Sequence, residues 1–333
     1  IYILMSKLEI VYLGSLYGHN GIVTSLVVGK DSNGEPLVVS GGRDKRLIVW
    51  KLHLKNPEAV VSDNKDSEEK IVGKPFKSLS GHNHFISSLD ISNDSKFVIS
   101  GSWDKTVRLW DLNSFKTKKI LKGHAKDILA VAFSADSRYI ISGSMDNTLK
   151  VWNVNGEIKH DINEQFRGWV STIKHVKRPD KNNLIAVGSW DQNVNLYEPK
   201  NFTFVSSIQG FDYGVVSTDC DDDGEFMFTA EKNGKIRVHK VGTENTFEAK
   251  STVDVNADLN AISFESKYYM VISCATNKGL MINKVNQLSK TDYARTGSAC
   301  HCLAWDAAKE HLFAGFADGV IRVFKFSYDE QKN

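Results

Sequence analysis

The stretch that decides the fold is SGSWDKTVRLWD, residues 100–111. A short apolar segment, residues 97–100, leads into a polar turn that holds Asp104, and residues 106–110 then alternate apolar and polar side chains. Alternation with a period of two is typical of a β-strand with one buried face. The two segments on either side of the turn therefore predict a β-hairpin.

The same pattern recurs further along the chain. Gly123-His124 precedes SGSMDNTLKVWN, residues 142–153, just as Gly81-His82 precedes the first stretch. In both copies the His lies 22 positions before the turn Asp, and the Trp follows that Asp by 6. Self-similarity with a period of roughly 40–45 residues, marked by Gly-His and Trp-Asp, predicts an all-β fold, a β-propeller built from WD repeats.

Seven copies can be traced, which predicts a seven-bladed propeller. The residues in the Trp position of the seven copies are Trp50, Trp110, Trp152, Tyr197, His239, Asn283 and Phe324. The last copy is not followed by an outer strand of its own. Residues 9–13 can supply that strand, so that the N-terminal strand pairs into the last blade and closes the ring.

We expect a single domain over residues 8–326, with flexible ends at residues 1–7 and 327–333 and with Met5 as an alternative native start. An insertion, residues 53–75, follows the first repeat; it is rich in charge and has no periodicity. We expect it to be an exposed loop. It is a candidate partner site, although a solvated loop is the simpler interpretation.

Three repeats carry a full set of four polar marks. In each, a His, a strand Ser, the turn Asp and the Trp can form a hydrogen-bonded chain that satisfies a half-buried carboxylate. The predicted sets are His19, Ser40, Asp44 and Trp50, then His82, Ser100, Asp104 and Trp110, and finally His124, Ser142, Asp146 and Trp152. We interpret these tetrads as structural rather than catalytic.

Composition and motif content favour a non-catalytic interaction protein. The chain is 41% hydrophobic and 25% charged, with a net charge of +2, which is ordinary for a globular protein. Residues 1–198 hold more basic than acidic side chains, which permits a basic rim. Nucleotide-binding, zinc-protease and nucleophile-elbow motifs are absent, so we expect no enzyme activity, no cofactor and no metal.

The four cysteines come late and are irregularly spaced, so neither a disulfide framework nor a zinc site follows. Strand alternation places Cys300 and Cys302 on one face, in the core, and reduced thiols fit the cytosol. The sequence has no apolar run of membrane-spanning length and no recognisable signal peptide, which predicts a cytoplasmic protein.

Over residues 8–326 the chain resembles the receptor for activated C kinase family, seven-bladed scaffolds of the eukaryotic small ribosomal subunit. The motifs that carry the resemblance are GHNHF at 81–85, SGSWD at 100–104, GHAKD at 123–127, SGGRDK at 40–45, GSWD at 188–191 and LFAG at 312–315. The resemblance implies a non-catalytic adaptor, cytoplasmic and ribosome-associated, that binds ribosomal RNA and small-subunit proteins. It also implies recruitment of kinases of the protein kinase C type and other signalling proteins to translating ribosomes, with no membrane insertion and no small-molecule substrate.

The resemblance assigns RNA contact to the blade-one turn, where Arg and Lys side chains can neutralise phosphates. Basic residues at or near the same rim of blades two and three would extend the contact. The predicted RNA-binding residues are Arg43, Lys45, Lys105, Arg108, Lys126 and Lys150. Blade three departs from the family, because Met145 and Asn147 stand where basic residues are typical. The alternative for Arg43 and Lys45 is a solvated hairpin turn.

Three tryptophans stand out as candidate protein-binding residues: Trp103, Trp169 and Trp190. An exposed Trp on a rigid rim favours a binding hot spot, and the alternative is local packing over a neighbouring turn. Two other functions stay open. One is a ribosome-independent signalling propeller that resembles a G-protein β subunit; the other is an enzyme, which a dry, carboxylate-lined central channel would favour.

Overall fold

The structure is a computed structural model. It describes residues 3–5, 8–31, 33–54, 70–176, 178, 183–242, 246–265, 270–276, 279–284, 291–294, 296–306, 308 and 310–328.

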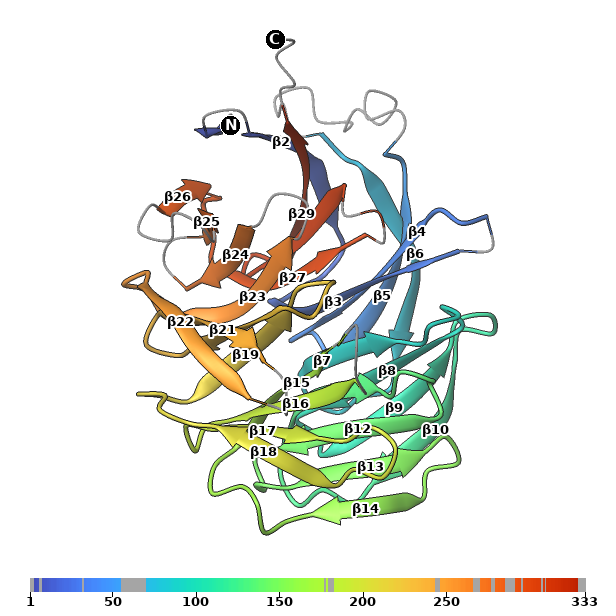
Figure 1. Cartoon of the computed structure of the whole chain (residues 1–333). Coiled ribbons are helices and arrows are strands. Elements are labelled where there is room, and N and C mark those ends of the chain that lie inside the picture. Colours follow the sequence, from blue (N-terminus) through green and yellow to red (C-terminus); the bar gives the residue numbers. More distant parts are fainter. Residues whose placement is uncertain are drawn as a thin grey trace.

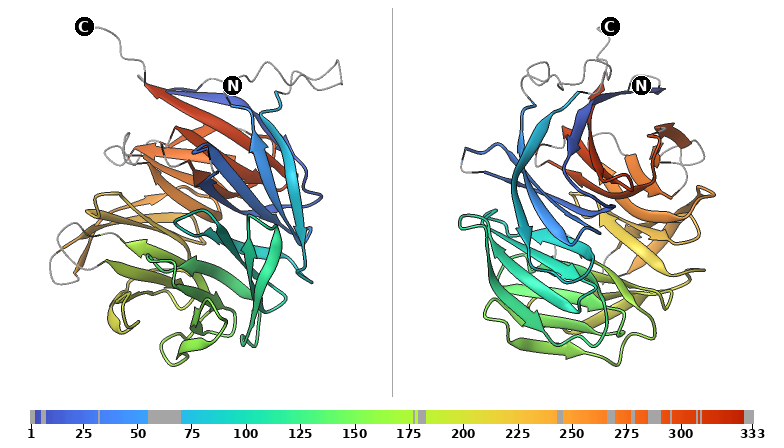
Figure 2. Two further views of the ribbon diagram at one scale, coloured as in Figure 1. Left: turned by 90° about the vertical axis from the view of Figure 1, so that its right-hand side faces the viewer. Right: turned by 180° about the vertical axis from the view of Figure 1, so that it is seen from behind.

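Seven antiparallel sheets follow one another around a ring in chain order (Figure 1, Figure 2). From the centre of the ring outward, blade one is β3 (Val23–Lys30), β4 (Pro36–Gly42), β5 (Arg46–Leu52) and β6 (Gly73–Ser80). In the same order, blade two is β7 (Ile86–Ile91), β8 (Phe97–Ser102), β9 (Thr106–Asp111) and β10 (Lys116–Lys122). Blade three is β11 (Ile128–Phe133), β12 (Tyr139–Ser144), β13 (Leu149–Asn153) and β14 (Ile158–Ile162).

The remaining blades repeat this plan. Blade four is β15 (Val170–Val176), β16 (Leu184–Ser189), β17 (Val194–Tyr197) and β18 (Phe204–Ile208). Blade five is β19 (Val215–Cys220), β20 (Phe226–Glu231), β21 (Lys235–Val241) and β22 (Phe247–Asp254). Blade six is β23 (Leu259–Glu265), β24 (Met270–Ala275), β25 (Gly279–Lys284) and β26 (Thr291–Ala294). Blade seven is β27 (Cys300–Trp305), β28 (His311–Phe316), β29 (Val320–Tyr328), β2 (Leu8–Tyr17) and β1 (Ile3–Met5).

The ring closes through the N-terminal strand, as predicted. β2 pairs antiparallel with β29, with Tyr12 opposite Phe324, and the blue and red strands lie side by side in Figure 2. The innermost strands of adjacent blades touch all the way round, including β27 against β3. The seven-bladed all-β fold is therefore confirmed. Residues 3–5, expected in a flexible end, instead form β1 and add a fifth strand to this sheet.

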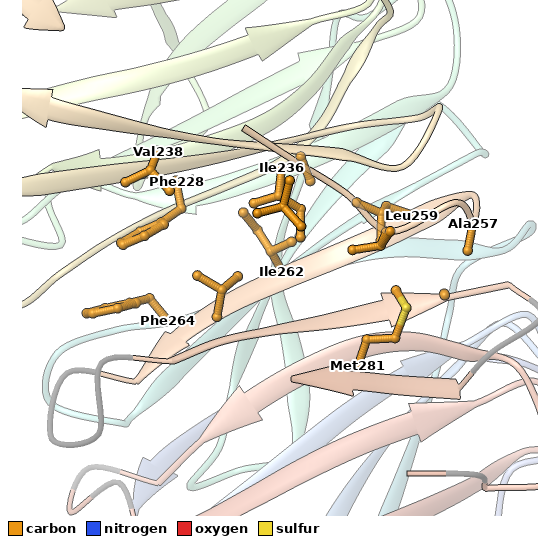
Figure 3. Packing of buried hydrophobic residues seen from close by; sticks show 13 residues of the cluster. Phe228, Ile236, Val238, Ala257, Leu259, Ile262, Phe264 and Met281 are labelled. Atoms are coloured by element: carbon orange, nitrogen blue, oxygen red, sulfur yellow. The ribbon is translucent and has the colours of Figure 1, made fainter. Parts of the chain in front are cut away.

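Apolar clusters fill the space between adjacent blades. Trp50, Trp110 and Trp152 are fully buried, so the Trp positions are part of the core. Between blades five and six the Phe228 and Phe264 rings stack with centroids 4.4 Å apart (Figure 3). Burial of one such side chain is worth roughly 1.5–3 kcal/mol. Blades five and six have lost the tetrad pattern, and this packing holds them together.

Every inner strand carries a β-bulge at the same place, which the sequence pattern did not predict. Each bulge adds one residue, and in four blades that residue donates a side-chain hydrogen bond to a backbone carbonyl of the next blade. These bonds run from Thr24 to Ile86, from Ser87 to Ile128, from Ser171 to Val215 and from Asn260 to Cys300. The bulges therefore join one blade to the next.

The insertion is shorter than predicted at its C-terminal end. Residues 73–75 belong to β6, and the Val72 side chain is buried. Ser15 of β2 exchanges backbone hydrogen bonds with Lys70 and Val72, so this end is fixed to the strand that closes the ring. Residues 73–75 join β6 because the backbone groups on the outer edge of β5 need hydrogen-bonding partners. The rest of the predicted loop, residues 55–69, lies outside the described residues.

The expectations for the cysteines need two corrections. The structure pairs Cys274 of β24 with Cys300 of β27 as a disulfide across blades six and seven, whereas Cys220 and Cys302 are free. Cys300 and Cys302 are both buried but do not share a face, because the β27 bulge lies between them. Cys300 packs between blades six and seven, and Cys302 packs between blades seven and one.

Candidate nucleic-acid interface

The β4–β5 and β8–β9 hairpin turns and the connections between blades lie on one side of the ring, because neighbouring strands alternate in direction. We call this side the turn face. It carries four predicted RNA-binding residues whose side chains are exposed: Arg43, Lys45, Lys105 and Lys126. Of the salt bridges among the described residues, none involves these four side chains. Their charges therefore remain available to a partner.

A hydrogen-bonded chain fixes the turn of blade two. His82 Nδ1 lies 2.7 Å from Asp104 Oδ2 and His82 Nε2 lies 2.7 Å from Ser100 Oγ. The Trp110 indole N–H donates to Ser100 Oγ at 2.8 Å. The equivalent residues of blades one and three form the same chain. The tetrads thus tie the turn to two strands and to the preceding inter-blade connection.

The turn carboxylates are held in their charged form. Burial opposes ionisation of Asp44, but hydrogen bonds and charge from His19, together with the amides of Asn20 and Arg46, outweigh it and lower the Asp44 pKa to about 2. The pKa values of Asp104 and Asp146 are lowered by the same balance of burial against His and Thr hydrogen bonds. The three carboxylates are consequently ionised near neutral pH and keep their hydrogen bonds to the connection and the turn.

Lys45 and Lys105 occupy an unusual backbone conformation. Their φ angles are 68° and 69°, in the left-handed region where a residue with a Cβ is disfavoured by roughly 1 kcal/mol. Blades five and seven place Gly234 and Gly319 at the same turn position. Lysine at this position is therefore not explained by backbone preference.

Arg43 spans the junction of blades one and two. Its guanidinium carbon lies 5.4 Å from the centroid of the Phe85 ring. A guanidinium over an aromatic face is held electrostatically while its N–H groups remain free to donate. The contact positions Arg43 at the boundary between the two blades that carry most of the predicted interface.

Blade two adds a concave basic site of about 400 Å³. Lys105, Arg108 and Lys122 line it, and the Arg108 guanidinium lies over the Trp110 ring at 5.9 Å. Arg108 is half-buried, so its side chain lines the wall of this site and does not project into solvent as the exposed lysines do. Lys122, at the end of β10, was not among the predicted RNA-binding residues.

The expected exposure of Lys150 on the RNA-binding rim is wrong. Its side chain is buried in β13 and its ammonium forms a salt bridge with Asp161 of β14. Strand position decided this outcome: Lys150 pairs with Ser142 on one side and Asp161 on the other, well inside the blade. Its charge is therefore paired inside the blade, and Lys126 is the predicted cation of blade three that the turn face displays.

The three tryptophans divide into two groups. Trp103 is only partly exposed; it stacks on His84 and contacts Phe85, so local packing accounts for it and the hot-spot assignment is withdrawn. Trp169 and Trp190 are 38% and 41% exposed, with ring centroids 5.0 Å apart.

Tyr213, which no sequence pattern marked, is 57% exposed and precedes Gly214, on which the Trp190 ring packs. Together Trp169, Trp190 and Tyr213 form an aromatic patch on blade four.

The central channel does hold carboxylates. Asp90 accepts a hydrogen bond from the Phe133 amide, and burial raises the Asp90 pKa. Asp219 accepts from the Phe264 amide and pairs with Lys174 at 2.7 Å. Both carboxylates thus hold the next blade in place. Within the described ranges no cluster of three His, Cys, Asp or Glu could hold a metal, and no helix there is long and apolar enough to cross a bilayer.

Comparison with known proteins agrees with this architecture. The family model "WD domain, G-beta repeat" matches residues 10–51, 73–111 and 115–153. The "Small ribosomal subunit protein RACK1" of Drosophila melanogaster is 38% identical over 94% of this chain and 96% of its own length. The Caenorhabditis elegans protein of the same name is 36% identical over 94% of this chain and 96% of its own. "Small ribosomal subunit protein RACK1y" of Oryza sativa subsp. japonica is 36% identical, covering 94% and 95%.

The chain belongs to the RACK1 family. The matches to RACK1 proteins run through blades four to seven, where the repeat model finds nothing, so the degenerate blades are part of the family likeness. The predicted resemblance to the receptor for activated C kinase family is confirmed.

Proposed function

We propose that this chain is a non-catalytic scaffold of the small ribosomal subunit that contacts ribosomal RNA through the turn face of blades one and two. Full-length relatives named as small ribosomal subunit proteins support the ribosomal part of the proposal. The RNA contact rests on one observation: Arg43 and Lys45 project from a turn that a buried tetrad holds rigid.

The chemistry of the contact is neutralisation of phosphates. Arg43 can donate two parallel hydrogen bonds to a phosphate, and Lys45 acts as a compact point charge beside it. Lys105 and Lys126 continue the row of exposed cations onto blades two and three. Arg108 lines the concave site of blade two. Such contacts fix register and orientation on folded RNA without reading its sequence.

The test is co-sedimentation of the purified chain with small ribosomal subunits. Arg43→Asp combined with Lys45→Glu is expected to lower the bound fraction at least tenfold at physiological salt, without changing the melting temperature by more than about 2 °C. The matched control reverses Lys200 and Lys240, which are exposed on blades four and five. If the double variant sediments as the wild type does, the RNA assignment is wrong.

We further propose that the aromatic patch of Trp169, Trp190 and Tyr213 receives a signalling protein, such as a kinase of the protein kinase C type. Paired exposed tryptophans on a rigid blade have the character of an interface hot spot. Trp190→Ala is expected to weaken capture of the partner kinase at least tenfold and to leave ribosome sedimentation unchanged. Equal kinase capture by the variant would rule out this surface.

A further inference from the structure

A groove of about 960 Å³ opens between blades one and two. Its walls include the β3–β4 turn, the segment after β5 and the β9–β10 turn. Because strands in a blade are antiparallel, these connections lie on the face opposite the turn face. A partner in the groove would therefore not compete with RNA bound at Arg43 and Lys45.

The floor of the groove is apolar. Leu37, Leu52, Leu54 and Leu112 line it together with Phe115. A concave site of this volume with an aliphatic floor suits large apolar side chains.

Phe76 stands at the wall of the groove and is 53% exposed. It is the extra residue of a bulge in β6, because Lys77 pairs with Val49 while Pro75 pairs with Trp50. A bulge redirects the side chain of its extra residue. In β6 the bulge turns Phe76 toward Phe115 of blade two, where the two rings meet edge to face at 5.6 Å.

The rim of the groove carries cations that repel one another. Lys51 and Lys74 face each other directly across β5 and β6, and both are exposed. Like charges in directly opposed positions destabilise a strand pair. The Lys77 ammonium lies 5.9 Å from the Phe115 ring centroid, and Lys30 adds a further positive charge. An anionic partner would relieve this repulsion.

The acidic residues of the groove offset these charges only in part. Asp31 accepts hydrogen bonds from the amides of Asn33 and Glu35, within its own turn. Asp94 accepts from the Ser92 hydroxyl and forms a long contact of 3.7 Å with Lys96. With Glu35, these three carboxylates line the groove beside Lys30, Lys51 and Lys96. Lys74 and Lys77 of β6 lie next to the groove and bring the lysines to five, so the net charge that an incoming partner meets is positive.

We propose that this groove binds an acidic protein segment that inserts an aromatic or leucine side chain beside Phe76 and Phe115. The lysines attract the acidic residues, and the leucine floor takes the apolar anchor. A protein is favoured over RNA because, apart from Phe76 and Phe115, the apolar floor is made of Leu37, Leu52, Leu54 and Leu112, which offer neither a stacking plane nor hydrogen-bonding edges to a base. The site goes beyond the scaffold function proposed above and does not depend on the RNA contact.

The experiment selects random twelve-residue peptides from a phage library on the immobilised full-length chain. Recovered sequences are expected to combine Asp or Glu with Trp, Phe or Leu. As synthetic fluorescent peptides they are expected to bind the Phe76→Asp variant at least tenfold more weakly than wild type. Phe204→Asp is the matched control, since Phe204 is 46% exposed on the outer strand of blade four, and it should change affinity less than twofold.

A second variant, Lys51→Glu with Lys74→Glu, keeps the test decisive if Phe76→Asp does not fold; it should also weaken binding at least tenfold. The proposal is overturned if no peptide is enriched over beads, if the recovered peptides are basic, or if they bind every variant equally. It is also overturned, in favour of a nucleic-acid groove, if a twelve-nucleotide uridine RNA binds in a manner that depends on Phe76.

Discussion

Asp44, Asp104 and Asp146 show how one residue position supports both fold and function. Each carboxylate accepts bonds from a His of the preceding connection and from a backbone amide after it. The turn is thereby held in place, and in blade one the side chains on either side of the Asp, Arg43 and Lys45, are exposed. The same four-residue pattern that identifies the repeat also builds the platform for the candidate interface.

The lowered pKa of Asp44 predicts acid sensitivity. In the unfolded chain this carboxyl titrates near 3.9, and in the folded chain at about 2. Its contribution to stability, roughly 2 kcal/mol, is therefore complete above about pH 4 and is lost as the pH falls towards 2. Denaturant unfolding from pH 6 to pH 2 should show a steeper loss for wild type than for Asp44→Asn. Parallel curves would contradict this assignment.

The left-handed position of Lys45 predicts a separation of stability from function. Asn tolerates this conformation, so Lys45→Asn should leave the melting temperature unchanged or slightly raised while it weakens sedimentation with small subunits. Gln192→Asn in blade four is the control, since Gln192 has a φ of 68°. It should give the same thermal result with no loss of sedimentation. A marked destabilisation by Lys45→Asn would show that Lys45 has a structural role.

At the scale of elements, the seams between blades depend on the bulge residues of the inner strands. Ser87 donates its hydroxyl to the Ile128 carbonyl of blade three. Ser87→Ala should leave that buried carbonyl unpaired and lower stability by about 1–3 kcal/mol. Ser87→Thr should restore it, because Thr24 makes the same bond in blade one. Thermal unfolding of both variants checks this prediction. Equal melting temperatures for Ser87→Ala and Ser87→Thr would contradict it.

The closing strand predicts a larger effect. Deletion of residues 1–17 removes β1 and β2, so that β29 keeps its pairing with β28 but loses the partner on its outer edge. An unpaired edge with apolar residues promotes association between chains. We expect the truncated chain to lose cooperative unfolding and to form aggregates, as seen by calorimetry and size-exclusion chromatography. A monomer that melts like the full chain would show that ring closure does not need this strand.

The sequence predicted strands well where apolar and polar residues alternate clearly. It predicted the hydrogen bonds of a turn less well where a residue at another position supplies the acceptor. In blade five Asn233 stands at the position of the turn Asp, so the tetrad pattern is incomplete there. Instead Glu231, two residues earlier, accepts bonds from the Asp212 and Tyr213 amides and from Arg237. The position changed while the physical need, an acceptor for the loop amides, stayed. A pattern tied to fixed spacing could not find it.

At the scale of the whole molecule, the number of blades and the closure of the ring followed from periodicity, because each repeat needs neighbours to bury its two faces. The site was harder to predict. Exposed turns gave Arg43, Lys45, Lys105 and Lys126 correctly as accessible cations, whereas the burial of Lys150 depends on its cross-strand partner Asp161.

The groove between blades one and two was also out of reach of the sequence, because it joins residues of two repeats. The two faces of the ring, one basic and polar and the other lysine-rimmed and apolar, would give the two proposed partners separate surfaces.

The proposed phosphate contacts of blades one and two are tested most sharply by the salt dependence of binding to small ribosomal subunits. The logarithm of the association constant should fall linearly with the logarithm of salt concentration, with a slope of about −0.7 to −0.9 per phosphate contact. Arg43→Asp with Lys45→Glu should make that slope shallower by roughly 1.4–1.8, the share of two contacts. A wild-type affinity that does not change with salt, or a slope that the double variant leaves unaltered, would contradict an RNA contact through this turn.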